Sequence, residues 1–447
     1  MANKPLSAVD LMTLGAVELR DRMAAGALSS EALVTACLAR IAEREEVVQA
    51  WAYLDGENAL EQARTLDALR KSGRPIGPLH GLPVGIKDII DTAKVPTENG
   101  CTLDIGRVPV YDASVVEKLK AAGAIIMGKT VTTELAFMHA GKTRNPHAPD
   151  HTPGGSSSGS AAAVADAMVP LAIGTQTGGS VIRPASYCGV TGFKPSFGLI
   201  SRRGILPQSP SLDTVGVFAT DVAGAALLAE TLAGYDVADT ATTPTPTPRL
   251  LTTANDEPPL PPVYAFIKPP GWDDAELHEA FGQLSEALGE QAFDVELPEV
   301  FNHAAAERQR INFAEMSRCY HHYWRDGKDQ LGAETREAIE NGNTTLARDY
   351  LAALDWREVL YAPLEEIFER CDAIISPAST GPAPKGLEFT GNPVFNGLWT
   401  FLGTPAITIP LLTAGNGLPM GVQLSGPREG DGRLLRSARW LFDWADG

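Results

Sequence analysis

The sequence has little positive charge and no long hydrophobic run. Lys and Arg together number 37, against 55 Asp and Glu, so the formal net charge is −18. Binding to nucleic acid or to an anionic membrane depends on Lys and Arg that neutralise phosphates, so this balance argues against both as partners. Because no apolar stretch is long enough to cross a bilayer, we also expect no membrane-spanning segment.

Cysteine is scarce and unpatterned. The five cysteines are widely spaced, and no two of them form a CxxC pair. An odd, scattered set of this kind is typical of reduced, buried thiols in a reducing compartment. The first residues, MANKPLSAVDLMTL, include Asp10 and lack a basic start followed by an apolar core, so we expect no signal peptide. These features predict a soluble, cytoplasmic protein.

The sequence also lacks a late histidine of the kind that α/β-hydrolases use. Residues 155–159 match the GxSxG elbow of those enzymes, but no strand precedes them, and His322 is the last histidine. His147 and His151 lie in a loop that supplies no rigid face for a metal, and His321 points away from His322 on a helix. We therefore expect no metal site and no histidine base.

Residues 123–130, GAIIMGKT, fit the P-loop expression GxxxxGK[ST]. A true P-loop has a strand before its first glycine and a helix after the Lys-Thr pair. Here a helical segment precedes Gly123, and the middle residues AIIM are themselves the strand. A nucleotide-binding module that uses Gly123 to Thr130 is therefore kept only as an unfavoured, non-enzymatic alternative.

Helical and strand-like segments alternate along the chain. Residues 6–46 and 57–71 have helical patterns, whereas residues 81–88, GLPVGIKD, form a short apolar run typical of a buried strand whose end delivers Lys87. A helix and then a strand are expected within residues 115–127. This alternation predicts an α/β fold with a parallel or mixed sheet.

The second half of the chain begins with a proline-rich stretch. Residues 240–262 read as an extended surface connection rather than a folded piece. We do not treat it as a domain boundary, because the strand-like residues 263–267 can rejoin the same sheet. Long helices are predicted over residues 304–324 and 345–370. Late strands are predicted at residues 373–375, 406–409 and 422–424.

Two glycine-flanked serine clusters lie close together, GGSSSGS at 154–160 and GGS at 178–180. The glycines let a bound group approach the backbone and leave N–H donors free to point at it. A serine so placed is a candidate nucleophile if a base lies within reach. Lys87 is the best candidate base, because burial can lower the pKa of a lysine by several units. An ion pair between Lys87 and Asp88 is the alternative that the spacing leaves open.

Three separated motifs resemble those of the amidase signature family. They are GIKDIIDT at 85–92, PGGSSSGSAAAVA at 153–165 and GTQTGGSVIRPASYCGVTGFKP at 174–195, supported by TPAITIP at 404–410 and GLPMGVQLSGP at 417–427. The resemblance runs from about residue 6 to residue 440. It implies a single large α/β domain with a mixed central β-sheet, residues 1–447, with the family core at about 80–230.

The resemblance also implies a Ser–cis-Ser–Lys triad. Ser180 of GGS matches the nucleophile, Ser156 the bridging serine that follows a cis peptide bond from Gly155, and Lys87 the base. In this mechanism neutral Lys87 takes a proton from Ser156, Ser156 takes one from Ser180, and Ser180 attacks the amide carbonyl to form an acyl-enzyme. Ser157 and Ser158 are expected to provide hydrogen-bonding support.

The same resemblance implies an oxyanion hole made by backbone N–H groups at the start of a helix. The residues that supply these groups are Thr177, Gly178, Gly179 and Ser180. The relay then protonates the leaving ammonia or amine, and water releases the acid. No metal and no organic cofactor are needed for this chemistry.

The chain departs from the usual family string D-T-G-G-S-I-R. Gln176 replaces the acid, and Arg183 stands three residues after Ser180 instead of two, with Ile182 at the usual position of the arginine. If a helix begins at Ser180, residue 183 lies about 300° round the axis, back near the face of the serine. A guanidinium in that place can grip a carboxylate with two hydrogen bonds.

The string TQTGGSVIRPA resembles the malonamidase branch of the family, in which an arginine at this position recognises the carboxylate of a small amide. We therefore hypothesise an amidase that hydrolyses a small, carboxylate-bearing linear amide, with Arg183 as the anchor. A structural ion pair is the alternative role for Arg183. The side-chain pocket is expected to draw on residues 300–400 and on loops near Met138 and His139.

Two other enzymatic functions stay open within the family. One is a glutamine-dependent amidotransferase subunit that passes ammonia to a partner-bound acyl-tRNA, although such subunits generally keep the D-T-G-G-S form and Gln176 counts against it. The other is a hydrolase of aryl or fatty amides. Homodimers occur in the family, so the resemblance allows a homodimer.

Overall fold

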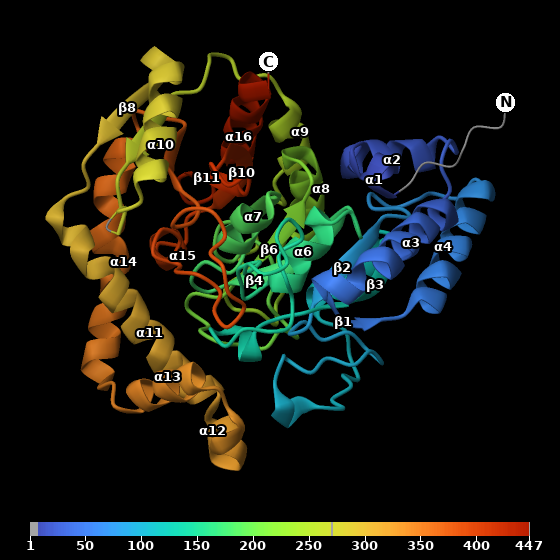
Figure 1. Ribbon diagram of the computed structural model, residues 1–447, viewed down its shortest axis with the longest axis horizontal. Helices are drawn as coiled ribbons and strands as arrows, with labels where there is room; N and C mark the ends of the chain where they lie inside the picture. Colours follow the sequence, from blue (N-terminus) through green and yellow to red (C-terminus); the bar gives the residue numbers. More distant parts are fainter. Residues whose placement is uncertain (1–7, 270, 447) are drawn as a thin grey trace.

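The computed structural model describes residues 8–269 and 271–446 and is built on one 11-stranded sheet (Figure 1). The strands are β1 (Trp51–Leu54), β2 (Pro83–Lys87), β3 (Ile125–Thr130), β4 (Leu171–Gln176), β5 (Thr191–Lys194), β6 (Thr214–Ala219), β7 (Tyr264–Ile267), β8 (Ala292–Val295), β9 (Ala373–Pro377), β10 (Ala406–Thr413) and β11 (Pro419–Ser425). Their order in the sheet is β1-β3-β2-β4-β6-β5-β10-β11-β9-β7-β8.

The sheet is mixed. β2 pairs in parallel with β3 and β4, and β7 pairs in parallel with β8 and β9, whereas the central pairs from β4 through β11 to β9 are antiparallel. The predicted fold class, an α/β domain with a mixed central sheet, is confirmed. The extents of that domain and of its core at about 80–230 stay predictions.

Sixteen helices are present in the described part of the chain. They are α1 (Ala8–Met12), α2 (Gly15–Ala24), α3 (Ser30–Val48), α4 (Gly56–Lys71), α5 (Ser114–Ala121), α6 (Ser158–Ala165), α7 (Ile182–Cys188), α8 (Val222–Leu232), α9 (Leu250–Asn255), α10 (Ala275–Leu288), α11 (Ala304–Cys319), α12 (His321–Gly327), α13 (Ala333–Asn343), α14 (Ala347–Phe368), α15 (Gly397–Phe401) and α16 (Asp431–Asp446). None of the helices within residues 8–269 and 271–446 is long and apolar enough to span a membrane.

The buried strand predicted at residues 81–88 is β2, and every residue of it is buried. β2 lies between β3 and β4, so both of its edges are paired, and the burial of every residue shows that both of its faces are covered by protein. A strand of this kind needs a continuous apolar run instead of an alternating one, which explains the sequence pattern. Lys87 is the last residue of β2, so its side chain is buried in the core at the end of this strand.

β3 removes the basis of the nucleotide-binding alternative. The strand runs through the Gly-Lys-Thr end of the P-loop match, where a phosphate loop would begin a helix. The Lys129 ammonium donates to the carbonyl oxygen of Ile90 and to Thr97 Oγ1, both at 2.6 Å. This lysine is therefore committed to the protein interior.

α6 and α7 pack against each other on the sheet, α6 over β2, β3 and β4 and α7 over β5, β10 and β11 (Figure 1). α6 is built from serine, glycine and alanine, and these small side chains let it lie close to its neighbours. A Cβ on Gly159 would stand 2.3 Å from the carbonyl oxygen of Ala50 and 2.4 Å from the N of Val131, so only glycine fits there. Both serine clusters are fixed at the ends of these two short helices.

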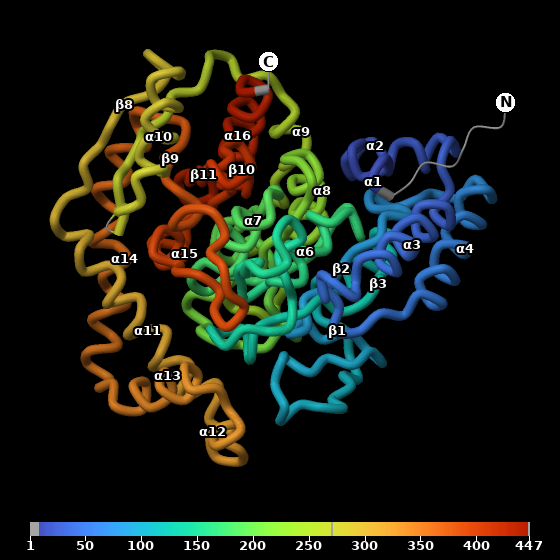
Figure 2. Tube along the Cα trace, viewed as in Figure 1, coloured from blue at the N-terminus to red at the C-terminus, as the bar shows by residue number. Residues whose placement is uncertain are grey.

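The second half of the chain forms a helical layer at one side of the molecule, where α11, α13 and α14 pack together (Figures 1 and 2). The single helix predicted over residues 304–324 is wrong in one respect, since it breaks at Tyr320 into α11 and α12. Tyr320 is fully buried and its hydroxyl donates to the carbonyl oxygen of Leu135 at 2.6 Å, which holds the break in place.

The proline-rich stretch at residues 240–262 differs from the expectation of an unfolded connection. It contains the short helix α9, which packs between α8 and α16. Leu250 and Ala254 are both buried there, and this apolar burial stabilises a helix that the composition does not suggest. The strand expected at residues 263–267 is β7, and it joins the same sheet as predicted.

Candidate active site

Lys87 is the most deeply placed group of the candidate site. Its Nζ lies 2.7 Å from Ser156 Oγ and 2.9 Å from Thr175 Oγ1. The lysine is completely buried, and burial lowers its pKa well below the ordinary value, although the negative charge of Asp213 acts in the opposite direction. Burial disfavours the charged ammonium, so the neutral amine that can accept a proton becomes accessible.

The ion pair between Lys87 and Asp88 that the spacing left open is not formed. Asp88 faces Lys129 instead, with 3.5 Å between Asp88 Oδ1 and Lys129 Nζ, and it also accepts the backbone N–H of Glu98 at 3.1 Å. Among the residues that the structure describes, Lys87 makes no ion pair. It can therefore serve as a base without first breaking one.

Ser156 lies between Lys87 and the loop that contains Thr133. The peptide bond between Gly155 and Ser156 is cis. The serine is 1% exposed, and its carbonyl oxygen accepts the N–H of Thr133 at 3.2 Å. The hydroxyl of Ser156 therefore has a fixed position next to Lys87 Nζ, which is the geometry that a proton relay needs.

The other serines of the first cluster bind the backbone of the sheet. Ser157 Oγ donates to the carbonyl oxygen of Thr175, and Ser158 Oγ donates to that of Val131. Ser160 Oγ donates to the carbonyl oxygen of Ile173. These contacts agree with the expected supporting role of Ser157 and Ser158, since they tie the start of α6 to β4 and to the residue that follows β3.

Ser180 stands in the turn between β4 and α7 and is the most exposed of the three candidate residues, at 9%. Among the described residues its Oγ makes no hydrogen bond, so the link from Ser156 to Ser180 rests on the family resemblance. The expectation that a helix begins at Ser180 is wrong by two residues, because α7 begins at Ile182. The serine that a substrate can reach is thus the one matched to the nucleophile.

Gln176 explains why the turn after β4 keeps its shape. Its Oε1 accepts the N–H groups of Val181 and Ile182, at 2.9 and 3.0 Å, and its Nε2 donates to Thr400 Oγ1 at 3.0 Å. The first residues of α7 are therefore capped from within the chain. The neutral side-chain amide of Gln176 therefore caps α7 at the position where the usual family string has a carboxylate.

The N–H groups of residues 177–180 donate no hydrogen bond within the described ranges of the chain. A Cβ on Gly179 would stand 2.3 Å from Asn396 Oδ1, so the close approach of Asn396 requires glycine at this position. Free, fixed N–H donors in a turn are suited to binding a developing oxyanion. Four neighbouring residues, Thr177, Gly178, Gly179 and Ser180, offer such donors.

Asp213 supports this turn from outside. Its Oδ1 accepts the hydroxyl of Thr177 at 2.5 Å, and its Oδ2 accepts the N–H groups of Gln208 and Ser209, each at 2.9 Å. Burial raises the pKa of Asp213 to about 6, while its hydrogen bonds act to lower it. Asp213 thus accepts the Thr177 hydroxyl, and its negative charge also acts to raise the pKa of Lys87. It therefore links the turn of residues 177–180 to the candidate base.

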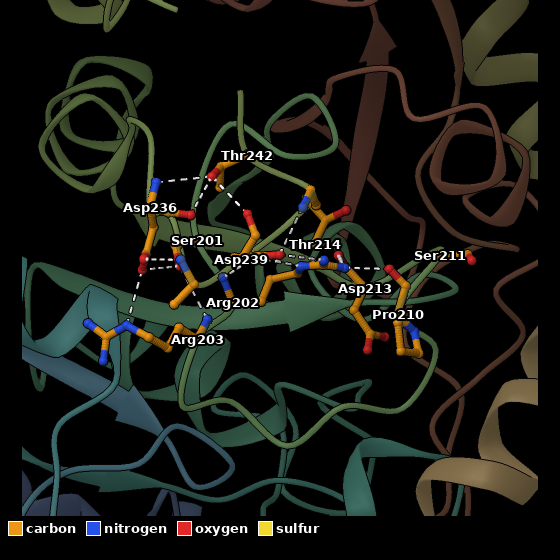
Figure 3. Close-up of polar contacts among 12 residues, drawn as sticks. Ser201, Arg202, Arg203, Pro210, Ser211, Asp213, Thr214, Asp236, Asp239 and Thr242 are labelled. Atoms are coloured by element: carbon orange, nitrogen blue, oxygen red, sulfur yellow. Dashed lines mark hydrogen bonds and ion pairs between the residues drawn. The ribbon is translucent and has the colours of Figure 1, made fainter. Parts of the chain in front are cut away.

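Arg202 fixes the loop that carries Asp213 (Figure 3). Its guanidinium pairs with Asp239, where Nη2 lies 2.8 Å from Oδ1 and Nε lies 3.0 Å from Oδ2. On its other side Nη1 donates to the carbonyl oxygens of Pro210, at 2.5 Å, and of Asp213, at 3.3 Å. This clamp orients the carboxylate of Asp213 towards Thr177.

Arg183 is almost completely buried, at 1% exposed. Its Nη2 donates to the carbonyl oxygen of Gly155 at 2.7 Å and to Thr390 Oγ1 at 3.1 Å, and its Nε and Nη1 have no partner in the described structure. The structural ion pair considered for Arg183 is not formed with any residue that the structure describes. Burial, together with the nearby Arg308, lowers the pKa of Arg183 to about 10, while Tyr187 acts to raise it.

One cavity borders the site, and a second lies on the other side of Arg308. The first, of about 250 Å³, is lined by Thr175, Thr177 and Asp213 among others. The second, of about 130 Å³, is largely apolar and includes Arg308 in its wall. Residues between 300 and 400 contribute to the second cavity, whereas Met138 and His139 line neither of the two. Which residues form the side-chain pocket stays a prediction.

Sequence reasoning found the three candidate residues of the triad but missed their neighbours. Thr175 carried a usable signal, because β2 and β4 are parallel and Ile86 pairs with Ile173, which places Thr175 beside Lys87. Asp213 and Arg308 reach the site from other parts of the chain, and no local pattern marks them. The described residues contain no group of three or more His, Cys, Asp or Glu side chains that could hold a metal ion.

Comparisons with known proteins agree with the motifs. The family model named Amidase matches residues 32–435. The A subunit of the glutamyl-tRNA(Gln) amidotransferase of Symbiobacterium thermophilum is 35% identical, covering 96% of this chain and 96% of that protein. The corresponding protein of Cutibacterium acnes is 33% identical, covering 96% and 94%. The native peptide amidase of Stenotrophomonas maltophilia has a solved structure with a TM-score of 0.85 and 29% identity, covering 97% of each chain.

These matches extend over nearly the whole chain and establish the resemblance at the level of the family, although not of its malonamidase branch. The chain therefore belongs to the amidase family, and it is an enzyme that hydrolyses carbon–nitrogen bonds.

Proposed function

We propose that this enzyme hydrolyses a small linear amide through an acyl-enzyme on Ser180, with Ser156 as the proton relay and Lys87 as the base. The observation that carries the proposal is the 2.7 Å distance between Lys87 Nζ and Ser156 Oγ, in a buried site where Lys87 has no ion-paired acid among the described residues. A lysine that is neutral and bonded to a serine hydroxyl has the arrangement of an activated nucleophile.

The acylation step follows from this arrangement. Lys87 takes the proton of Ser156, Ser156 takes that of Ser180, and the Ser180 oxygen forms a bond to the amide carbon. The negative charge that develops on the carbonyl oxygen is bound by N–H groups of residues 177–180, and each such donor contributes about 3 to 4 kcal/mol of transition-state stabilisation. Return of the proton through Ser156 to the nitrogen then breaks the C–N bond and releases ammonia or an amine.

Hydrolysis of the acyl-enzyme uses the same groups in reverse order. A water molecule takes the place of the amine, the relay removes its proton, and its oxygen attacks the ester carbon of acylated Ser180. The proton returns to Ser180 as the acid leaves. Lys87 ends in the neutral form in which it began, so the cycle needs no metal and no organic cofactor.

We propose a substrate whose acyl part carries a carboxylate, with Arg183 in contact with that charge. The support is the resemblance of TQTGGSVIRPA to the malonamidase branch and the two nitrogens of Arg183, Nε and Nη1, that have no partner in the described structure. A buried guanidinium with unused donors is costly unless an acceptor is supplied. The contact from Nη2 to Gly155 holds the side chain in place for this role.

A second function is favoured by the relatives. The two amidotransferase relatives named above are 33% and 35% identical to this chain over nearly its whole length. If the chain works in the same way, Ser180 attacks glutamine and the released ammonia passes to a partner. Gln176 argues for the first function, because the amidotransferase subunits generally carry an acid at that position. An aryl or fatty amide hydrolase remains the third possibility within the family.

An ammonia-release assay over a substrate panel separates these functions. The panel contains malonamate, its neutral analogue malonamide, glutamine, an aryl amide and a fatty amide. We expect the highest kcat/KM on malonamate and none above background in Ser180→Ala, whereas the matched variant Ser158→Ala keeps most of the activity. Preference for glutamine together with co-purification of a second protein would favour the amidotransferase. Turnover by Ser180→Ala would contradict every form of the proposal.

The role of Arg183 needs a comparison of two substrates. Arg183→Ala should lower kcat/KM on malonamate more than on malonamide, because only malonamate offers the carboxylate. An equal loss on both substrates would assign Arg183 to the support of Gly155 alone.

We also propose, on sequence grounds, that the enzyme acts in the cytoplasm. A homodimer is tested directly by light scattering of the purified protein.

A further inference from the structure

Arg308 is a second cation beside the candidate oxyanion hole. It lies on α11, far along the chain from the serine clusters, and α11 packs against α15 (Figure 1). A Cβ on Gly178 would stand 3.5 Å from Arg308 Nη1, and one on Gly397 would stand 2.6 Å from Arg308 Nε. The guanidinium therefore lies beside the turn that contains residues 177–180.

Arg308 has no anionic partner in the part of the chain that the structure describes, where it forms neither an ion pair nor a side-chain hydrogen bond. By contrast, Arg310 on the same helix forms an ion pair with Glu307. Burial lowers the pKa of Arg308 to about 10 with no compensating acid. An arginine that lies beside the turn with no acid and no acceptor among the described residues keeps its N–H donors available for a ligand.

Access distinguishes Arg308 from Arg183. Arg183 is 1% exposed and has already given Nη2 to Gly155 and Thr390, whereas Arg308 is only partly buried and lines the wall of the 130 Å³ cavity. The positive charge of Arg308 also contributes to the lowered pKa of Arg183, so the two cations act on each other. A site with two neighbouring guanidiniums and no acid is suited to an anion.

We propose that Arg308 makes the primary contact with the substrate carboxylate, and that Arg183 contacts the same carboxylate as the second positive charge. This inference rests on the proposed function, because it names the group that recognises the same substrate. Arg308 lies beside Gly178, which belongs to the turn proposed to bind the reacting carbonyl. The carboxylate and the scissile carbonyl must therefore be separated by only a few bonds, as in malonamate or succinamate, and not by a long chain.

The remaining wall of the cavity is consistent with a short organic acid. The residues that line it beside Arg308 are mainly apolar and include Phe301, Phe395, Leu398 and Trp399. These apolar side chains strengthen the interaction between the Arg308 guanidinium and a carboxylate, because the local dielectric constant is lower than that of water. A neutral amide at the same place forms weaker, uncharged hydrogen bonds and loses this advantage.

The test uses the full chain with Arg308→Ala and Arg308→Lys, and Arg310→Ala as the control. Charged hydrogen bonds contribute enough for Arg308→Ala to lower kcat/KM on malonamate by about 10- to 100-fold, mainly through KM. Activity on malonamide should stay within about threefold. Arg308→Lys should recover part of the loss, since it keeps the charge without the fork, and Arg310→Ala should resemble wild type on both substrates.

Equal losses on malonamate and malonamide, or no loss on malonamate, would overturn the inference. A binding measurement keeps it separate from the catalytic proposal: malonate, a dianion that is not an amide, should raise the Tm of the wild type and of Ser180→Ala but not that of Arg308→Ala. If no amide is turned over and malonate still distinguishes these variants, the proposed function fails while the anion site stands. If malonate shifts the Tm of Arg308→Ala as much as that of the wild type, the anion site fails.

Discussion

Lys87→Met tests the base of the proposed mechanism. Methionine is nearly as long as lysine and is accommodated in an apolar strand end, but it cannot accept a proton from Ser156. Removal of a general base lowers the rate by about 10²- to 10⁴-fold. We therefore expect kcat/KM to fall by at least this factor on every amide that the wild type hydrolyses, as measured by ammonia release.

The dependence of wild-type kcat/KM on pH tests the role of Lys87 independently of any substitution. Neutral Lys87 is the active form, so kcat/KM should rise with pH and level off above the pKa of Lys87. Because burial lowers that pKa well below the ordinary value, the plateau should be reached below the pH at which a free lysine, with a pKa of about 10.4, loses its proton. Residual activity of Lys87→Met should lack this rise.

Stability should report the lowered pKa as well. The unfolded chain binds a proton at Lys87 up to about pH 10.4, whereas the folded chain releases it at a lower pH. Between the two pKa values the unfolded state holds more protons, so the free energy of unfolding rises with pH by up to about 1.4 kcal/mol per pH unit. When urea unfolding is followed across the range, the slope should be smaller in Lys87→Met than in the wild type. It should not vanish, because burial also lowers the pKa of Lys129 to about 8 and that of Lys194 to about 7.

Lys129→Met is the matched control for these measurements. Lys129 is equally buried, on the neighbouring strand β3, but it bonds to Ile90 and Thr97 and not to a candidate catalytic serine. It should change stability without removing the dependence of kcat/KM on Lys87. A wild-type profile that does not fall at low pH, or a Lys87→Met enzyme with near-normal kcat/KM, would refute the assignment of Lys87 as the base.

Three further changes test the surroundings of the nucleophile. Asp213→Asn removes a negative charge that raises the pKa of Lys87, so the acid limb of the kcat/KM profile should move to lower pH; a shift in the other direction would contradict the coupling. Gly179→Ala places a Cβ 2.3 Å from Asn396 Oδ1, so we expect a lower Tm and a loss of kcat larger than that of Gly282→Ala, where a Cβ meets nothing within 4 Å. Gln176→Ala leaves two buried N–H groups of α7 without acceptors and should lower the free energy of unfolding by about 1 to 3 kcal/mol, which urea titration measures; an unchanged midpoint would show that the cap is dispensable.

The sequence was sufficient for the elements whose signal is local. The buried strand that ends at Lys87 follows from a run of apolar residues and glycines. The start of α7 was misplaced because Gln176 caps it from the preceding strand, and that contact depends on the fold of the turn. Local patterns therefore predict the existence of an element better than its first residue.

The candidate site was predictable where motif and chemistry coincide and not elsewhere. Ser156, Ser180 and Lys87 belong to three recognisable strings, and the structure places Lys87 against Ser156. Arg308 lies in a helical stretch where an arginine is unremarkable, and only the packing of α11 against α15 brings it to Gly178. Contacts of this kind are made by tertiary packing, which leaves no periodicity in the sequence.

The chain between β8 and β9 has a consequence for how this enzyme can diversify. α11 to α14 form one continuous excursion from the sheet, and Arg308 belongs to it, whereas Lys87 and both serine clusters belong to the strands and loops before residue 190. Substitutions within the excursion can therefore replace the group that meets the acyl part of the substrate while the bond-breaking groups stay untouched. Grafting this segment from one amidase to another is a direct route to exchange of substrate preference.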